Sequence, residues 1–166
     1  MVMTWTARAL SEQEHEAVRS DGSAAATLIE DEPPDPRRGV DLDTAWHGIH
    51  WLLTGSADSG EEPYCYLMFG GEPVGDVDVG YGPARALTSQ QVAAWSSALK
   101  EIPRDELAQR FDPKAMLEAD IYPNIWDRSL SGEEDTLDYL LQAYGGLRDF
   151  VAAAQREQSG LLVYLS

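Results

Sequence analysis

The chain has little cysteine, little positive charge and no long apolar run. Cys65 is the one cysteine among 166 residues, which excludes an internal disulfide or a thiolate metal cluster and suits a reducing compartment. No window approaches the roughly 20 consecutive apolar residues of a membrane-spanning helix. The N-terminal residues also lack the basic and apolar regions of a signal peptide. These absences predict a soluble, cytoplasmic protein.

Positive charge is scarce: 12 Lys and Arg stand against 29 Asp and Glu, which gives a net charge of −17. Such a surface repels nucleic-acid phosphates and anionic lipids, because proteins bind both through Lys and Arg. We therefore expect neither nucleic acid nor a membrane as a partner. A basic protein remains possible as a partner. The acids are scattered rather than gathered in one tract, which is typical of charge that keeps a protein soluble.

Helix starts are the clearest local signals. A Ser or Thr followed three residues later by Glu or Gln forms a capping box, in which the two residues bond each other's exposed amides. Such pairs occur at Ser11–Glu14, Thr88–Gln91 and Ser131–Glu134. Asp112 before Pro113 marks a further start, because proline is tolerated in the first turn of a helix.

The chain length fits a single domain over residues 1–166. The proline-rich residues 30–39 fit neither a helix nor a central strand. Residues 55–63 form a second loop. Apolar spacing predicts an α+β fold, with about six helices packed on a small mixed sheet of about four short strands. The predicted helices follow Ser11, span 24–29, 41–54, 88–101 and 103–110, follow Asp112 and cover 137–151; strands include 3–9, an apolar segment at 64–69 and 161–165.

Several segments resemble, in order, the YfbM-like family of bacterial domains of unknown function. They are MVMTWTARALS, DLDTAWHGIHWLLTG, FGGEPVGDVDVGYGPARALT, RFDPKAM, IYPNIWD and the terminal LLVYL. The resemblance covers nearly the whole chain, with Val2 as a departure from the usual Met-Gly-Met start. It implies a compact mixed α/β domain. It implies no activity, so no catalytic residue is carried over.

Polar residues on the helix predicted from Asp41 to Thr54 are the first candidates for a functional surface. At 100° per residue, Asp43, His47, His50 and Thr54 share one narrow stripe, away from the apolar face. Two histidines and a carboxylate suggest either a metal site or acid–base catalysis. However, the well-attested helical zinc pattern spaces its histidines at i, i+4, and it is missing here. We therefore predict no metal and no cofactor, and a structural role for the histidines, bonded to nearby loops.

The glycine-rich segment of residues 70–85 supplies the remaining candidates. It lacks the lysine of a P-loop and the spacing of a dinucleotide-binding loop, and its acids repel phosphate. We expect its glycines to serve turns and close backbone approach. We also expect Arg85 to pair with Asp76 or Asp78, and the segment to lie beside the histidine helix. The candidate surface comprises Asp43, His47, His50, Glu72, Asp76, Asp78, Tyr81 and Arg85.

No complete catalytic motif is present, which leads to two functional hypotheses. The first is a binding or interaction module without catalysis, an accessory or neutralising partner of another protein. The second is an enzyme or small-ligand-binding protein with a cleft between the 41–54 helix and the 70–85 loop. Histidines buried and bonded within the protein favour the first hypothesis, whereas histidines converging on an open pocket favour the second.

Overall fold

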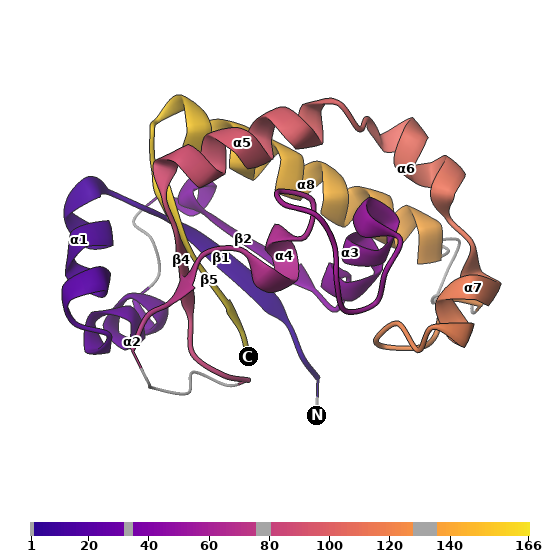
Figure 1. The fold of residues 1–166 in the computed structure, drawn as a ribbon, viewed down its shortest axis with the longest axis horizontal. Coiled ribbons are helices and arrows are strands. Elements are labelled where there is room, and N and C mark those ends of the chain that lie inside the picture. Colours follow the sequence, from indigo (N-terminus) through magenta and orange to yellow (C-terminus); the bar gives the residue numbers. More distant parts are fainter. Residues whose placement is uncertain (1, 32–34, 76–80, 128–135) are drawn as a thin grey trace.

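A five-stranded sheet organises the fold. The computed structural model describes residues 2–31, 35–75, 81–127 and 136–166. Within these ranges the strand order is β2-β1-β5-β4-β3, and eight α-helices and one 3-10 turn accompany the sheet (Figure 1). Each described pairing is antiparallel. The predicted α+β class is confirmed, with five strands where about four were expected and antiparallel pairing where a mixed sheet was expected.

The elements have the following bounds. The strands are β1 (Trp5–Leu10), β2 (Gly39–Asp43), β3 (Glu72–Pro73), β4 (Arg85–Leu87) and β5 (Gly160–Leu165). The helices are α1 (Glu12–Ser20), α2 (Ser23–Glu30), the 3-10 turn η1 (Pro36–Arg38), α3 (Trp46–Thr54), α4 (Tyr66–Phe69), α5 (Ser89–Lys100), α6 (Arg104–Arg110), α7 (Pro113–Glu118) and α8 (Thr136–Arg156). No helix in the described ranges is both long enough and apolar enough to span a bilayer.

The sheet separates two hydrophobic cores. Alternate residues of a strand point to opposite faces, so Trp5 and Ala7 of β1 enter the larger core while Leu10 enters the smaller one. Helices α3, α4, α5 and α8 contribute to the larger core, and α1 and α2 to the smaller one, on the other side of the sheet (Figure 1). Trp5 and Trp95 are both fully buried in the larger core.

The helix starts predicted at Ser11, Thr88 and Asp112 are confirmed. Ser11 Oγ accepts from the Glu14 amide at 3.1 Å, and the Ser11 amide donates to Glu14 Oε1 at 2.9 Å. Thr88 forms the same box at the start of α5. Asp112 caps α7 through the Ala115 amide at 3.1 Å. The Ser131–Glu134 box lies outside the described residues.

The helix predicted from Asp41 is wrong in its first third. Residues 39–43 form the edge strand β2, and α3 begins only at Trp46. Strand β2 pairs with β1, placing Val40 opposite Ala7 and Asp41 opposite Thr6. Asp41 does cap a backbone amide, that of Asp43 at 2.7 Å, but in a turn that ends a strand. An aspartate makes such local bonds equally well in turns and at helix starts, so pairing with β1 decided the outcome.

The apolar segment at 64–69, predicted as a strand, forms the short helix α4. A short apolar run does not distinguish a buried strand from a buried helical turn. Here the carbonyl of Leu67 accepts from the Trp5 indole at 2.8 Å and from Arg85 Nη2 at 2.9 Å. These side-chain donors satisfy the end of a helix that is too short to be stable alone.

Candidate functional site

Helix α3 places its two histidines against the loop of residues 55–63. Its apolar residues Ile49 and Leu52 enter the larger core. Gly48 packs so close to Trp126 that an added Cβ would lie 2.8 Å from the indole ring. This close approach fixes the rotation of α3 about its axis, so that His47 and His50 face the loop, with ring centroids 6.5 Å apart.

Both ring nitrogens of His47 are bonded to backbone groups. Nδ1 accepts from the Tyr122 amide at 2.8 Å, so the proton of the neutral ring lies on Nε2, which donates to the Ala57 carbonyl at 2.8 Å. The ring also stacks on Trp46, with centroids 5.1 Å apart and planes inclined by 15°. His47 therefore links α3 to two loops that are remote from each other in the sequence.

His50 is completely buried. Its Nε2 bonds the Ser59 carbonyl at 3.1 Å, and Phe69 of α4 contacts the ring edge-on at 5.9 Å between centroids. Burial lowers the pKa of His50 from 6.5 to about 4, with the bond to Ser59 opposing the shift and nearby His47 adding to it. His50 is consequently neutral at physiological pH, and its Nδ1 has no partner among the described residues.

Asp43 lies at the end of β2 and not on the histidine helix. Its Oδ2 accepts from the Tyr139 hydroxyl at 2.9 Å. The same hydroxyl hydrogen-bonds Oγ1 of Thr44 at 3.0 Å. Burial is the largest cause of the raised pKa of Tyr139, so the phenol stays a neutral donor. Asp43 thus joins β2 to α8, and it does not bond either histidine.

Arg85 supports the end of α4. Its Nη1 donates to the Gly70 carbonyl at 2.8 Å and its Nη2 to the Leu67 carbonyl at 2.9 Å. Burial lowers the pKa of Arg85 to about 10, which still leaves the guanidinium charged at neutral pH. Its predicted partners, Asp76 and Asp78, lie outside the described residues.

The described part of the glycine-rich segment follows α4, which ends at Phe69, and crosses toward α1 and α2. Val74 belongs to the smaller core, and Gly75, at φ 75°, packs its backbone against Gly22. This close contact is the role expected for its glycines. Glu72 is exposed on β3, and Tyr81, 39% exposed, bonds the Leu165 carbonyl through its amide. The structure therefore brings together His47 and His50, while Glu72 and Tyr81 lie apart from them.

Metal-binding and nucleophilic groups do not complete this surface. Across the described residues, no three His, Cys, Asp or Glu side chains are close enough to hold a metal ion. Cys65 is 4% exposed, and burial raises the pKa of its thiol, which disfavours the reactive thiolate. The described chemistry around α3 is that of hydrogen bonds within the protein.

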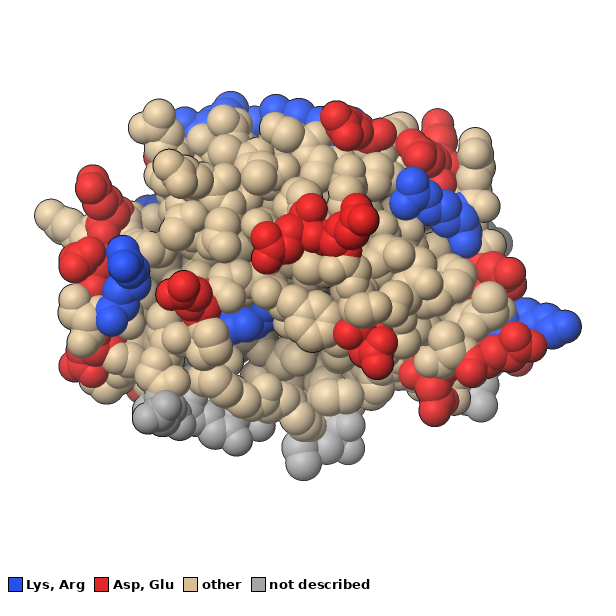
Figure 2. Space-filling model, in the orientation of Figure 1, with Lys and Arg blue, Asp and Glu red and all other residues tan. Residues whose placement is uncertain are grey.

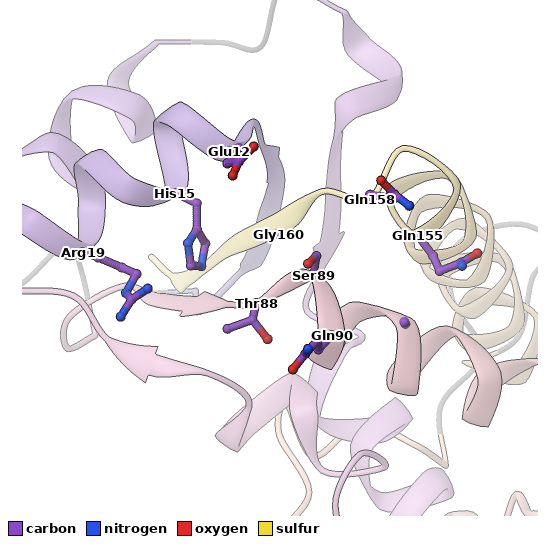
Figure 3. Close-up of a pocket in the computed structure, with 10 residues that line it drawn as sticks. Glu12, His15, Arg19, Thr88, Ser89, Gln90, Gln155, Gln158 and Gly160 are labelled. Carbon is purple, nitrogen blue, oxygen red and sulfur yellow. The ribbon is translucent and has the colours of Figure 1, made fainter.

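A polar groove that the sequence did not single out lies on another part of the molecule. Its volume is about 730 Å³, and it is bounded by α1, the start of α5 and the end of α8 (Figure 3). Helix α1 contributes Glu12, His15 and Arg19 to its wall. These residues follow one another at three- and four-residue spacing and so share a helix face. That spacing was the available local signal, but the other walls come from residues about 70 and 140 positions further along the chain.

Comparison with known proteins places the chain in a family without an assigned activity. The family model described as "Domain of unknown function (DUF1877)" matches residues 1–164. No curated protein matches the chain. Among solved structures, it is similar to YfbM from Escherichia coli, a protein of unknown function. The two share 17% sequence identity over 100% of each chain, with a TM-score of 0.66, which extends the similarity to the whole fold. Together with the YfbM-like segments in its sequence, these matches show that the chain belongs to the DUF1877 family of domains of unknown function.

Proposed function

We propose that this domain is a non-catalytic interaction module of the bacterial cytoplasm, which acts by binding another protein. The observation that carries this proposal is the state of the two histidines. His47 has both ring nitrogens bonded to the backbone, and His50 is fully buried. The residues with the most suggestive chemistry in the sequence are therefore used to hold loops in place.

Acid–base catalysis places two requirements on a histidine that this arrangement opposes. The ring must reach a proton on the substrate, and its pKa should lie near the working pH. His50 has no exposed surface and a pKa of about 4. His47 would have to give up a bond to Ala57 or Tyr122 before it reached a substrate. Both features favour binding over catalysis as the role of the domain.

The net charge of −17 supports a basic protein as the partner. Acidic side chains are spread over the face in Figure 2, with few basic ones among them. A surface of this kind steers a positively charged protein toward it and raises the association rate, an effect that salt weakens. An accessory or neutralising role follows, in which the domain covers a basic surface of its partner.

Recovery of a complex from cells that naturally express the protein tests this proposal. We expect affinity purification at low ionic strength to yield a stoichiometric second polypeptide with an isoelectric point above neutrality. With the recovered partner, the association rate should fall as sodium chloride rises. As a matched control, His50→Gln, which alters a completely buried side chain, should bind the partner equally well. A protein that elutes alone under these conditions, or whose partner binds independently of salt, would contradict the proposal.

The alternative, a small-ligand cleft between residues 41–54 and 70–85, receives less support. The histidines face the 55–63 loop, and Arg85 donates to the carbonyls of α4. Phe69, just before the glycine-rich segment, contacts the buried His50 ring of α3 edge-on. The groove beside α1 suits a small ligand better, and it carries an inference of its own.

A further inference from the structure

Two adjoining hollows beside α1 form one continuous polar surface. The larger, of about 730 Å³, and the smaller, of about 380 Å³, share His15, Arg19 and Thr88 in their walls. Each volume alone is in the range of pockets that hold small molecules. In Figure 3 the side chains of His15 and Arg19 project from α1 toward the strand that leads into Thr88, while Gln155 and Gln158 stand on the opposite side.

Arg19 is the charged group at the junction of the two hollows. Its side chain makes no hydrogen bond or ion pair with any described residue, and it is exposed. Many other arginines of this acidic chain are engaged: Arg8, Arg37, Arg38 and Arg110 each pair with a carboxylate. A free guanidinium in a concave site presents several donors arranged to match a carboxylate or a phosphate.

His15 lies in the wall of both hollows and packs against β5. Its ring lies so close to Gly160 that an added Cβ would be 2.8 Å from Cδ2. The ring Nε2 is shielded from solvent and has no hydrogen-bond partner among the described residues. A buried ring nitrogen without a partner is uncommon in a native protein and calls for a specific explanation. Nδ1 of His50 is unpartnered in the same way, so the ligand-binding chemistry of the groove lies with Arg19.

The start of α5 completes the site. This helix is 12 residues long, and its Thr88 cap satisfies the Gln91 amide at 3.1 Å. The backbone amides of Ser89 and Gln90 lie in the first turn, where an N–H group has no carbonyl acceptor within the helix. They carry the partial positive charge of the helix N-terminus. Ser89 and Gln90 both line the larger hollow. Arg19 and this helix start favour negative charge between them, while Glu12 in the larger hollow and Glu72 in the smaller one favour hydrogen-bond donors on the rest of the ligand.

We propose that this groove binds a small polar molecule through an oxyanion, a carboxylate or phosphate, held by Arg19 beside the start of α5. The amides of Gln90, Gln155 and Gln158 bond the remainder of the ligand. This binding is independent of the protein partner proposed above, because it uses Arg19 and the start of α5 and not the acidic side chains of the surface.

Amide chemical-shift titration of the intact protein by NMR tests the groove, since a chain of 18.3 kDa gives well-resolved spectra. The probes are sodium phosphate and sodium succinate, with sodium chloride at matched ionic strength as the reference. We expect saturating shifts at residues 12–19 and 88–91 with one of the two oxyanions and none with chloride. Phosphate saturating alone identifies a phosphorylated ligand, and succinate saturating alone identifies a carboxylate.

Two exposed arginines give the matched variants. Arg19→Gln should weaken the saturating probe at least tenfold, while Arg104→Gln, in the first turn of α6 and outside both hollows, should leave it unchanged. Both variants alter exposed side chains, and unchanged amide spectra away from the substitution verify that they fold. Shifts that do not saturate with either oxyanion, or that persist in Arg19→Gln, would overturn the proposal.

Discussion

Two histidine-bearing helices of this protein use similar residues in opposite ways. On α3, His47 and His50 are covered by loops, and most of their ring nitrogens bond backbone groups. On α1, His15 lines an open groove beside Arg19, which bonds no described residue. Polar residues on one helix face therefore predict that the face will form hydrogen bonds. Whether it bonds the protein's own backbone or remains open to a ligand depends on which segments pack against it.

The largest loss of folding stability is expected for a substitution at His47 on α3, in contrast to α1. His47→Ala leaves the Ala57 carbonyl and the Tyr122 amide, both part-buried, without this partner, and each unsatisfied group costs about 1–3 kcal/mol. The stack of the ring on Trp46 is lost as well. We expect a loss of about 4 kcal/mol, which lowers the unfolding midpoint by about 10 °C in a domain of this size. Circular dichroism on heating measures the change.

Two isosteric variants sharpen the His47 test. His47→Asn keeps an acceptor near the Tyr122 amide, and His47→Gln keeps a donor near the Ala57 carbonyl. Each should recover part of the stability lost in His47→Ala. If the alanine, asparagine and glutamine variants are all as stable as the wild type, the two hydrogen bonds do not stabilise the fold.

The pH dependence of stability should report His50. The unfolded chain binds a proton on this residue near pH 6.5, whereas the folded protein does so only near pH 4. Between these values the unfolded state binds more protons, so stability is lost as the pH falls. The loss attributable to His50 should reach up to about 3 kcal/mol. Because carboxylates also titrate in this range, the wild type is compared with His50→Gln, which does not titrate.

The wild-type curve should therefore fall more steeply than that of His50→Gln between pH 6.5 and 4. Urea unfolding at several pH values provides both curves. Parallel curves would mean that His50 takes up its proton equally well in both states, and the description of a buried neutral ring would have to be abandoned.

A smaller loss is expected at Arg85, which belongs to the same buried region. Arg85→Met removes the donors to the Gly70 and Leu67 carbonyls, although Leu67 keeps its bond from the Trp5 indole. We expect a cost of about 2 kcal/mol. Arg85→Lys should be intermediate, because an ammonium group does not reproduce the two-pronged geometry of a guanidinium. Equal stability of all three proteins in urea would show that Arg85 does not support α4.

The smallest stability effect is expected on α1. Arg19→Gln removes no hydrogen bond or ion pair among the described residues, and such surface substitutions change stability by about 0.5 kcal/mol or less. Thermal unfolding without added ligand measures this change. A loss above about 1 kcal/mol would place Arg19 in the same structural class as the α3 histidines and remove the contrast between the two helices.

Helix starts were predictable because their determinants are local. The Ser11 and Thr88 boxes each span four residues and form as expected. The YfbM-like segments likewise indicated a compact mixed fold over the whole chain. In contrast, β2 was missed because its pairing partner is β1, more than 30 residues earlier. Residues 64–69 form a helix because Trp5 and Arg85, both remote in sequence, bond its end.

The candidate site was predictable only in part for the same reason. His47 and His50 share a helix face in the sequence and in the structure. The Tyr122 amide that bonds His47 is 75 residues away, and no local pattern announces it. The groove beside α1 combines residues 12–19, 88–93 and 155–160, three segments that only the sheet and its helices bring together. Residue spacing in the sequence identified which helix faces are polar. Contacts between segments distant in the sequence determine whether such a face bonds the protein itself or lines a groove.

The central claim is that the α3 histidines stabilise the fold while the groove beside α1 is free for a ligand. Chemical unfolding of His47→Ala, His50→Ala and Arg19→Gln tests this claim most directly. The account predicts lower midpoints for both histidine variants, with Arg19→Gln close to the wild type. Unchanged or raised midpoints for both histidine variants would contradict it, since residues of a working site are often replaced without loss of stability.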